Sequence, residues 1–92
     1  MVIPSVRLIV HGRVQGVGFR HFVRRTAVSL AIAGWVRNRP DGTVEVEANG
    51  ERQGLDRLVA AVSQGPAGAR VTEVEQEWSE REPGPRGFHV AG

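Results

Sequence analysis

The sequence predicts an α+β fold in which two helices pack on one face of an antiparallel sheet. Apolar residues alternate in several short segments, and in two longer segments they recur at intervals of three and four residues. Glycine or proline stands at most of the boundaries between these segments. The order of elements is therefore β-α-β-β-α-β, with the last strand region split by a loop. Two interleaved β-α-β halves of this kind form the ferredoxin-like sandwich.

The first half begins with a strand at residues 6–11, because alternate residues of this segment are apolar. These residues are Val6, Leu8 and Val10. The period changes at Phe19, where a helix is expected to run to about Ile32, and Gly34 lies just beyond its end. The apolar face of this helix consists of Phe22, Val23, Thr26, Ala27 and Leu30.

A hairpin is expected after the first helix. Its strands are residues 35–39 and residues 43–48, and a tight turn from Arg39 to Gly42 joins them. Proline presets φ at the second position of this turn, and glycine suits the last position. The inward residues of the second strand are Val44, Val46 and Ala48.

The second half adds a helix and two strands. The helix follows Asn49-Gly50 and ends at Gly65-Pro66. Its apolar residues are Leu55, Leu58, Val59 and Val62. A strand at residues 71–78 has an irregular inner set, which is Val71, Val74, Gln76 and Trp78. Residues 88–90 form a short last strand, and with no repeat or linker the sequence predicts a single domain over residues 1–92.

The composition excludes several classes of function. There is no cysteine, and the three histidines do not share a metal-ligand spacing, so we expect no metal site and no cofactor. All 12 cations are arginine and the net charge is only +2, which does not indicate a nucleic-acid-binding protein. No apolar run is long enough to span a bilayer, and the first residues lack the features of a signal peptide. We therefore expect a cytoplasmic protein without a membrane partner.

The segment from Gly12 to Arg20 is a glycine-rich turn between a strand and a helix. A turn of this kind can direct backbone N–H groups toward an anion, next to the positive end of the helix dipole. It is not a P-loop, because the chain has no lysine, and the dinucleotide fingerprint would need a glycine where His21 stands. On the pattern alone, the turn is either an anion site or a tight connection without a ligand.

The cations beside this turn favour the anion site. Arg20 and His21 fall in the first turn of the expected helix, where positive charge is disfavoured by about 0.3–1 kcal/mol per group. A bound phosphate would reverse the sign of this interaction, and arginine offers it a planar, two-pronged donor. Arg24 and Arg25 lie further along the helix and are typical of a solvated face.

The stretch from Gly12 to Arg20 resembles the signature of the acylphosphatase family. Gly34-Trp-Val-Arg-Asn38, followed by Asp41-Gly-Thr-Val44, is similar to a second motif of that family. The resemblance covers essentially the whole chain and implies the same β-α-β-β-α-β sandwich. It also implies a hydrolase that acts on small-molecule acyl phosphates. We expect this hydrolase to need no metal ion or cofactor, because no ligand cluster is visible, and to be inhibited by its product, inorganic phosphate, which fits the same site. A single small antiparallel domain is commonly monomeric, so we expect a monomer.

The same resemblance implies two catalytic residues. Arg20 would bind the phosphate, assisted by the backbone N–H groups of a substrate-binding loop. This loop consists of Gln15, Gly16, Val17, Gly18, Phe19 and Arg20. Asn38 would orient the attacking water. Without the resemblance, an asparagine two residues before a Pro-Asp-Gly sequence is more typical of a turn residue.

Two alternative functions share the expected fold. Larger hydrogenase-maturation proteins that handle carbamoyl phosphate begin with an acylphosphatase-like unit. RNA-recognition modules have the same fold, but they need exposed aromatic residues on the central strands, where this chain presents Val, Glu and Arg. His11 and His21 flank the glycine-rich turn, and both are more typical of passive surface residues.

Overall fold

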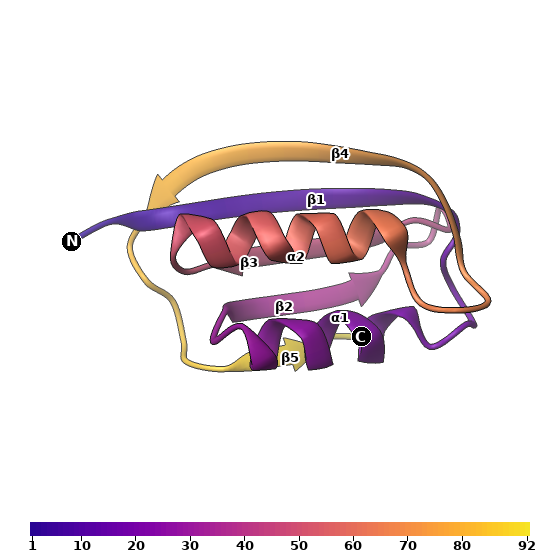
Figure 1. The fold of residues 1–92 in the computed structure, drawn as a ribbon, viewed down its shortest axis with the longest axis horizontal. Helices are drawn as coiled ribbons and strands as arrows, with labels where there is room; N and C mark the ends of the chain where they lie inside the picture. The colour runs from indigo at the N-terminus through magenta and orange to yellow at the C-terminus, as the bar shows by residue number, and fades with distance from the viewer.

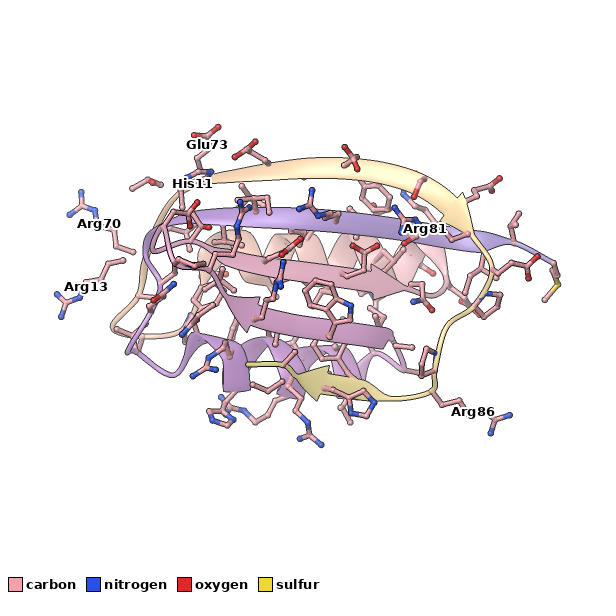
Figure 2. The ribbon with its side chains drawn as sticks, turned by 180° about the vertical axis from the view of Figure 1, so that it is seen from behind. His11, Arg13, Arg70, Glu73, Arg81 and Arg86 are labelled. Carbon is pink, nitrogen blue, oxygen red and sulfur yellow. The ribbon has the colours of Figure 1, made fainter.

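Five strands and two helices make up the chain, and the computed structural model describes all 92 residues. The elements are β1 (Ile3–Arg13), α1 (Phe19–Ser29), β2 (Ala33–Asn38), β3 (Val44–Asn49), α2 (Arg52–Gln64), β4 (Arg70–Arg81) and β5 (Phe88–Val90). Both helices cover the same face of the sheet (Figure 1), and no helix covers the opposite face (Figure 2). The ferredoxin-like α+β fold predicted from the sequence is confirmed. Neither helix is long and apolar enough to cross a membrane.

The strands form one sheet in the order β4-β1-β3-β2-β5. Neighbouring strands among the first four are antiparallel, as expected, but β5 pairs with β2 in parallel. The sheet is therefore mixed and not wholly antiparallel. The reason is geometric: β4 ends at the end of the sheet where β2 begins. The loop that crosses from one edge to the other, residues 82–87, therefore brings β5 in with the same direction as β2 (Figure 1).

The predicted apolar faces form the core between the sheet and the helices. The inward residues of β1 and β3 are fully buried, and both helices place apolar residues against them. The helical residues that are buried in this way are Phe19, Val23 and Ala27 of α1, and Leu55, Leu58 and Val62 of α2. Burial of each large side chain contributes about 1.5–3 kcal/mol, so this packing fixes the two helices over the sheet.

Helix α1 is three residues shorter than expected. It ends at Ser29, and Ala31 adopts a left-handed φ of 57°. The N–H of Ile32 then returns to the carbonyl of Ala27 at 2.9 Å. This turn directs Ile32 into the core, where it is buried. A continuing helix would not place Ile32 there, so core packing overrides the helical period.

Strand β4 has the irregular inner set that the sequence indicated, with one correction. The register with β1 shifts between His11 and Gly12, so that Val10 pairs with Val74 and Gly12 with Val71. This bulge explains how Val71 and Val74, three residues apart, both pack against the core. Gln76 does not, because it is exposed at the edge of the sheet, where its Oε1 accepts a hydrogen bond from Trp78.

On the open face, one buried carboxylate joins the three central strands. Glu45 of β3 accepts hydrogen bonds from Arg7 of β1 (2.6 Å) and from Arg37 of β2 (2.7 Å). Only 4% of its side chain is exposed. Burial alone would raise the pKa of Glu45, but the hydrogen bonds from Arg37 and Arg7 outweigh this effect and hold the pKa below its ordinary value.

We therefore predict a pH-dependent loss of stability in Glu45→Gln. A carboxylate whose pKa is lowered by folding stabilises the protein above its unfolded-state pKa of about 4.3 and ceases to do so as the pH falls through the folded-state pKa. At pH 7 the variant should lose about 1–3 kcal/mol of unfolding free energy. This deficit should shrink below pH 4, as measured by urea unfolding. Glu80→Gln, at an exposed residue with no ion pair, is the control; an equal deficit at pH 3 and pH 7 would contradict this account.

Candidate active site

The glycine-rich segment between β1 and α1 is a short arch held at both ends by buried residues. Val14 precedes it and Phe19 begins the helix, and both side chains lie in the core. Between them, Gly16 and Gly18 have φ values of 74° and 76°. A side chain rarely adopts this left-handed conformation, so the glycines allow the chain to turn within four residues.

The backbone N–H groups of this arch have no partner in the protein. Residues 15–18 donate no hydrogen bond to another backbone group, and Gly18, the N-cap of α1, provides no side-chain cap. The first turn of α1 also contains no acidic residue. Unpaired N–H groups at a helix N-terminus carry partial positive charge and suit an anion. The arch therefore presents unpaired N–H donors beside the N-terminus of α1.

Arg20 lies one residue inside α1 and is half-buried. Its Nη1 donates a hydrogen bond of 2.8 Å to the backbone oxygen of Gly92. The segment after β5 reaches Arg20 because the N–H of Ala91 continues the β2 pairing by donating to Val36. The two residues are 72 positions apart, so no local sequence signal indicates this contact. It occupies one of the five guanidinium N–H donors and leaves the others available to a ligand.

Asn38 is the last residue of β2, and its side-chain Oδ1 is buried without a hydrogen-bond partner. It is the one such side-chain atom in the protein. A buried polar atom left unpaired costs about 1–3 kcal/mol, and an exception of this kind in a folded protein requires an explanation. Asn38 is therefore not explained by turn chemistry, which would give its side chain a backbone partner.

The sheet register brings Asn38 and the arch to the same end of the molecule. Val44 of β3 pairs with Val10 of β1 on one side and with Asn38 of β2 on the other. Neighbouring strands are about 4.8 Å apart, so the Cα atoms of Asn38 and Val10 are about 10 Å apart. The arch follows Val10 by a few residues, and Figure 1 shows it beside the β2–β3 turn.

The side chain of Gln15 joins the arch to that turn directly. Its Nε2 donates to the backbone oxygens of Arg39 (2.8 Å) and Thr43 (2.9 Å). These two residues bracket the turn that immediately follows Asn38. From the sequence, only the backbone N–H group of Gln15 is expected to take part in the loop. A glutamine inside a glycine-rich loop does not reveal its partners, because they lie 24 and 28 residues away.

The predicted turn from Arg39 to Gly42 is present and rigid. The N–H of Gly42 donates to Arg39 O at 3.1 Å, and Asp41 Oδ1 accepts from the hydroxyl (2.5 Å) and the N–H (3.0 Å) of Thr43. These hydrogen bonds lower the pKa of Asp41. The turn therefore provides a fixed anchor for both Gln15 and Asn38.

The two histidines that flank the arch lie outside this arrangement. His11 Nε2 contacts Glu75 across β1 and β4 at 2.5 Å, and His21 is exposed on α1 without a hydrogen bond. The protein has no group of three or more His, Asp or Glu side chains arranged to hold a metal ion.

Comparison with known proteins identifies the class that this fold and site define. The family profile described as Acylphosphatase matches residues 6–90. An acylphosphatase of Koribacter versatilis is 51% identical over 86 residues, which are 94% of this chain and 78% of that protein. The crystal structure of acylphosphatase from Bacillus subtilis superposes with a TM-score of 0.95 at 41% identity, covering 98% of this chain and 100% of that one.

The chain therefore belongs to the acylphosphatase family, as its motifs indicated. It also resembles part of a much larger protein. The structure of HypF from T. kodakarensis matches with a TM-score of 0.81 at 27% identity, over 96% of this chain but only 12% of that protein. Both the identity and the TM-score are lower than for the Bacillus subtilis acylphosphatase.

We predict that Gln15→Leu destabilises the protein by about 1–3 kcal/mol, because two hydrogen bonds are lost within a partly buried junction and each carbonyl oxygen keeps only its backbone donor. Urea unfolding measures this change. Gln53→Leu, on the exposed surface of α2 and without a side-chain hydrogen bond, should change the stability by less than about 0.5 kcal/mol. Equal effects of the two substitutions would show that the Gln15 bridge does not hold the arch against the turn.

Proposed function

We propose that this protein hydrolyses the carboxyl–phosphate bond of acyl phosphates by direct attack of water, without a metal ion. The observation that carries the proposal is the buried, unpaired Oδ1 of Asn38 beside an arch of unpaired N–H groups. An anion on the arch would supply the partner that its N–H groups lack, and Asn38, which makes no hydrogen bond in the protein, stands free to take part beside it. The membership of the family supports the same reaction.

The phosphoryl group would bind to the N–H groups of residues 15–20 and to the guanidinium of Arg20. Negative charge on its oxygens is the main demand of phosphoryl transfer, and prearranged donors meet this demand without reorganising. The contact with Gly92 restrains Arg20 before the substrate arrives. Inorganic phosphate carries the same oxygens and is expected to compete for this site.

Asn38 would hold the attacking water through its side-chain amide group, which offers both a carbonyl oxygen and an NH₂ group. An acyl phosphate releases a carboxylate, whose pKa is near 4, so the leaving group needs no strong acid. The remaining requirement is a water in line with the breaking P–O bond, and positioning alone can supply a large part of the rate. Gln15 fixes the distance between water and phosphate, because it ties the arch to the turn next to Asn38.

The proposal is tested by the hydrolysis of benzoyl phosphate by the purified protein in the presence of EDTA. We expect full turnover in EDTA and competitive inhibition by inorganic phosphate. Turnover that EDTA abolishes and Mg²⁺ or Zn²⁺ restores would overturn the metal-free mechanism. Purely noncompetitive inhibition would place the anion away from the arch.

We predict that Arg20→Lys lowers turnover at least ~10²–10³-fold, because lysine keeps the charge but loses the two-pronged donor. The matched control is Arg24→Ala, one helical turn further along α1, where the side chain is exposed and has no ion pair. We expect little change in this control. Comparable losses in both variants would mean that a diffuse positive field binds the substrate instead of one placed guanidinium.

We predict that Asn38→Ala lowers kcat by roughly 10²-fold or more and leaves the inhibition constant of phosphate nearly unchanged. Because the Asn38 side chain makes no hydrogen bond in the protein, the substitution should not lower the melting temperature. A role as a turn residue predicts the reverse, a destabilised protein with nearly normal turnover. One variant measured for kcat, phosphate inhibition and melting temperature separates the two roles.

A further inference from the structure

A cavity lies on the open face of the sheet, at the end opposite the arch. The loop of residues 82–87 forms one wall, and outward side chains of β1, β2, β3 and β5 form the floor. Figure 2 shows Arg81 and Arg86 at this end of the molecule and His11 and Arg13 at the other. The cavity has a volume of about 230 Å³. Pockets for drug-sized ligands measure about 300–1,000 Å³, so this cavity has room for a small molecule or a single side chain.

The floor carries hydrogen-bond acceptors that have no donor in the protein. Only 18% of the Glu47 side chain is exposed, yet its carboxylate accepts no hydrogen bond. Arg81 Nη1 lies 3.5 Å from Glu47 Oε1 and forms an ion pair without a hydrogen bond. Asn49, on the same side of β3, is half-buried and also makes no side-chain hydrogen bond. A largely desolvated carboxylate gains most from a charged N–H donor, so the floor suits a ligand that carries one.

An aromatic ring stands beside these acceptors. Trp35 of β2 is the partner of Glu47 in the β2–β3 register, and both residues line the cavity. The chain already places a guanidinium on this ring, because Arg37 Cζ is 5.4 Å from its centroid. Arg37 also donates to Glu45, and it does not line the cavity. Two residues along the strands, the protein thus combines an arginine, Trp35 and a glutamate of β3 in one contact, and the cavity offers the same ring with a second glutamate.

We propose that this cavity binds a guanidinium group, held between the indole of Trp35 and the carboxylate of Glu47. A guanidinium is planar, so it stacks on an aromatic ring and presents two parallel N–H groups to a carboxylate. A compact ammonium carries the same charge but lacks this fork. Asn49 Oδ1 offers a further acceptor on the same floor. The site lies at the far end of the sheet from the arch, so it is separate from the proposed hydrolysis of acyl phosphates.

The two tryptophans of the chain provide the first test, in the unmodified protein. Butylguanidinium is titrated while NMR follows the indole N–H resonances of Trp35 and Trp78, which a Trp78→Phe variant assigns. Trp78 is the internal control, because its Nε1 already donates to Gln76 and it lies outside the cavity. We expect a saturable shift of the Trp35 resonance alone. A Trp35 resonance that does not move, or that moves only together with that of Trp78, would overturn the proposal.

The source of the guanidinium is distinguished by a second ligand, acetylarginine amide, which carries the same group on a peptide backbone. Binding of butylguanidinium but not of the amide assigns a free small molecule. Binding of both with similar affinity assigns an arginine side chain of another protein. These measurements need no substrate, so failure of the proposed hydrolysis remains distinguishable from failure of this inference.

Dissociation constants from titration calorimetry, at low and matched ionic strength, test the two assigned contacts. Glu47→Gln keeps the size of the side chain and should weaken the binding of butylguanidinium about tenfold. Glu77→Gln is the matched control and should change nothing, because Glu77 faces Arg7 from β4 as Glu47 does from β3 but lies outside the cavity. Butylammonium should bind about fivefold more weakly than butylguanidinium. Equal effects of the two substitutions, or equal affinities of the two cations, would overturn the guanidinium site.

Discussion

The pairing of β1 with β3 is the constraint on which the rest of the structure depends. β1 is an inner strand of the sheet, and the chain enters the arch directly from its end, whereas the β2–β3 turn lies directly before β3. Because Val44 is the partner of both Val10 and Asn38, the two registers of β3, with β1 and with β2, fix the arch and Asn38 relative to each other. A slip by one residue would turn every inward valine of these strands to the open face. The core therefore protects the geometry of the site.

Hydrogen bonds then make this arrangement rigid on a finer scale. Gln15 donates to both ends of the β2–β3 turn, Asp41 closes the turn through Thr43, and Arg20 is held by the segment after β5. These contacts join parts of the chain that are far apart in sequence and meet at one end of the sheet. Asn38 and the arch N–H groups are left unpaired within this rigid frame. The polar groups that hold the scaffold together are paired with one another, whereas the arch N–H groups and Asn38 are not. Such an arrangement is suited to bind a ligand without reorganising.

Charged side chains, like the polar groups, are paired in one part of the sheet and unpaired in another. On the open face the arginines of β1 and β2 are matched with Glu45, a buried carboxylate that joins three strands and stabilises them. At the end beside the arch, Arg20 lies within the first turn of a helix that has no acidic residue there. This placement of Arg20 costs stability in the absence of a ligand. The molecule thus uses compensated charge where it needs stability and uncompensated charge where we propose that it binds anions.

The sequence by itself determined the order of elements, the residues of the core and the position of the arch. Alternation in Val44, Val46 and Ala48 and the helical spacing of Leu55, Leu58 and Val62 depend on local burial, which a periodic pattern records directly. The helix end at Ser29, the parallel pairing of β5 and the exposure of Gln76 were decided by the tertiary structure, because each depends on packing or on an edge that local sequence does not encode. The same holds for the site. The motifs indicated Gln15, Arg20 and Asn38, but the Gln15 bridge, the contact between Arg20 and Gly92 and the missing partner of Asn38 arise only when distant segments meet, since a hydrogen bond depends on where its partner lies in space.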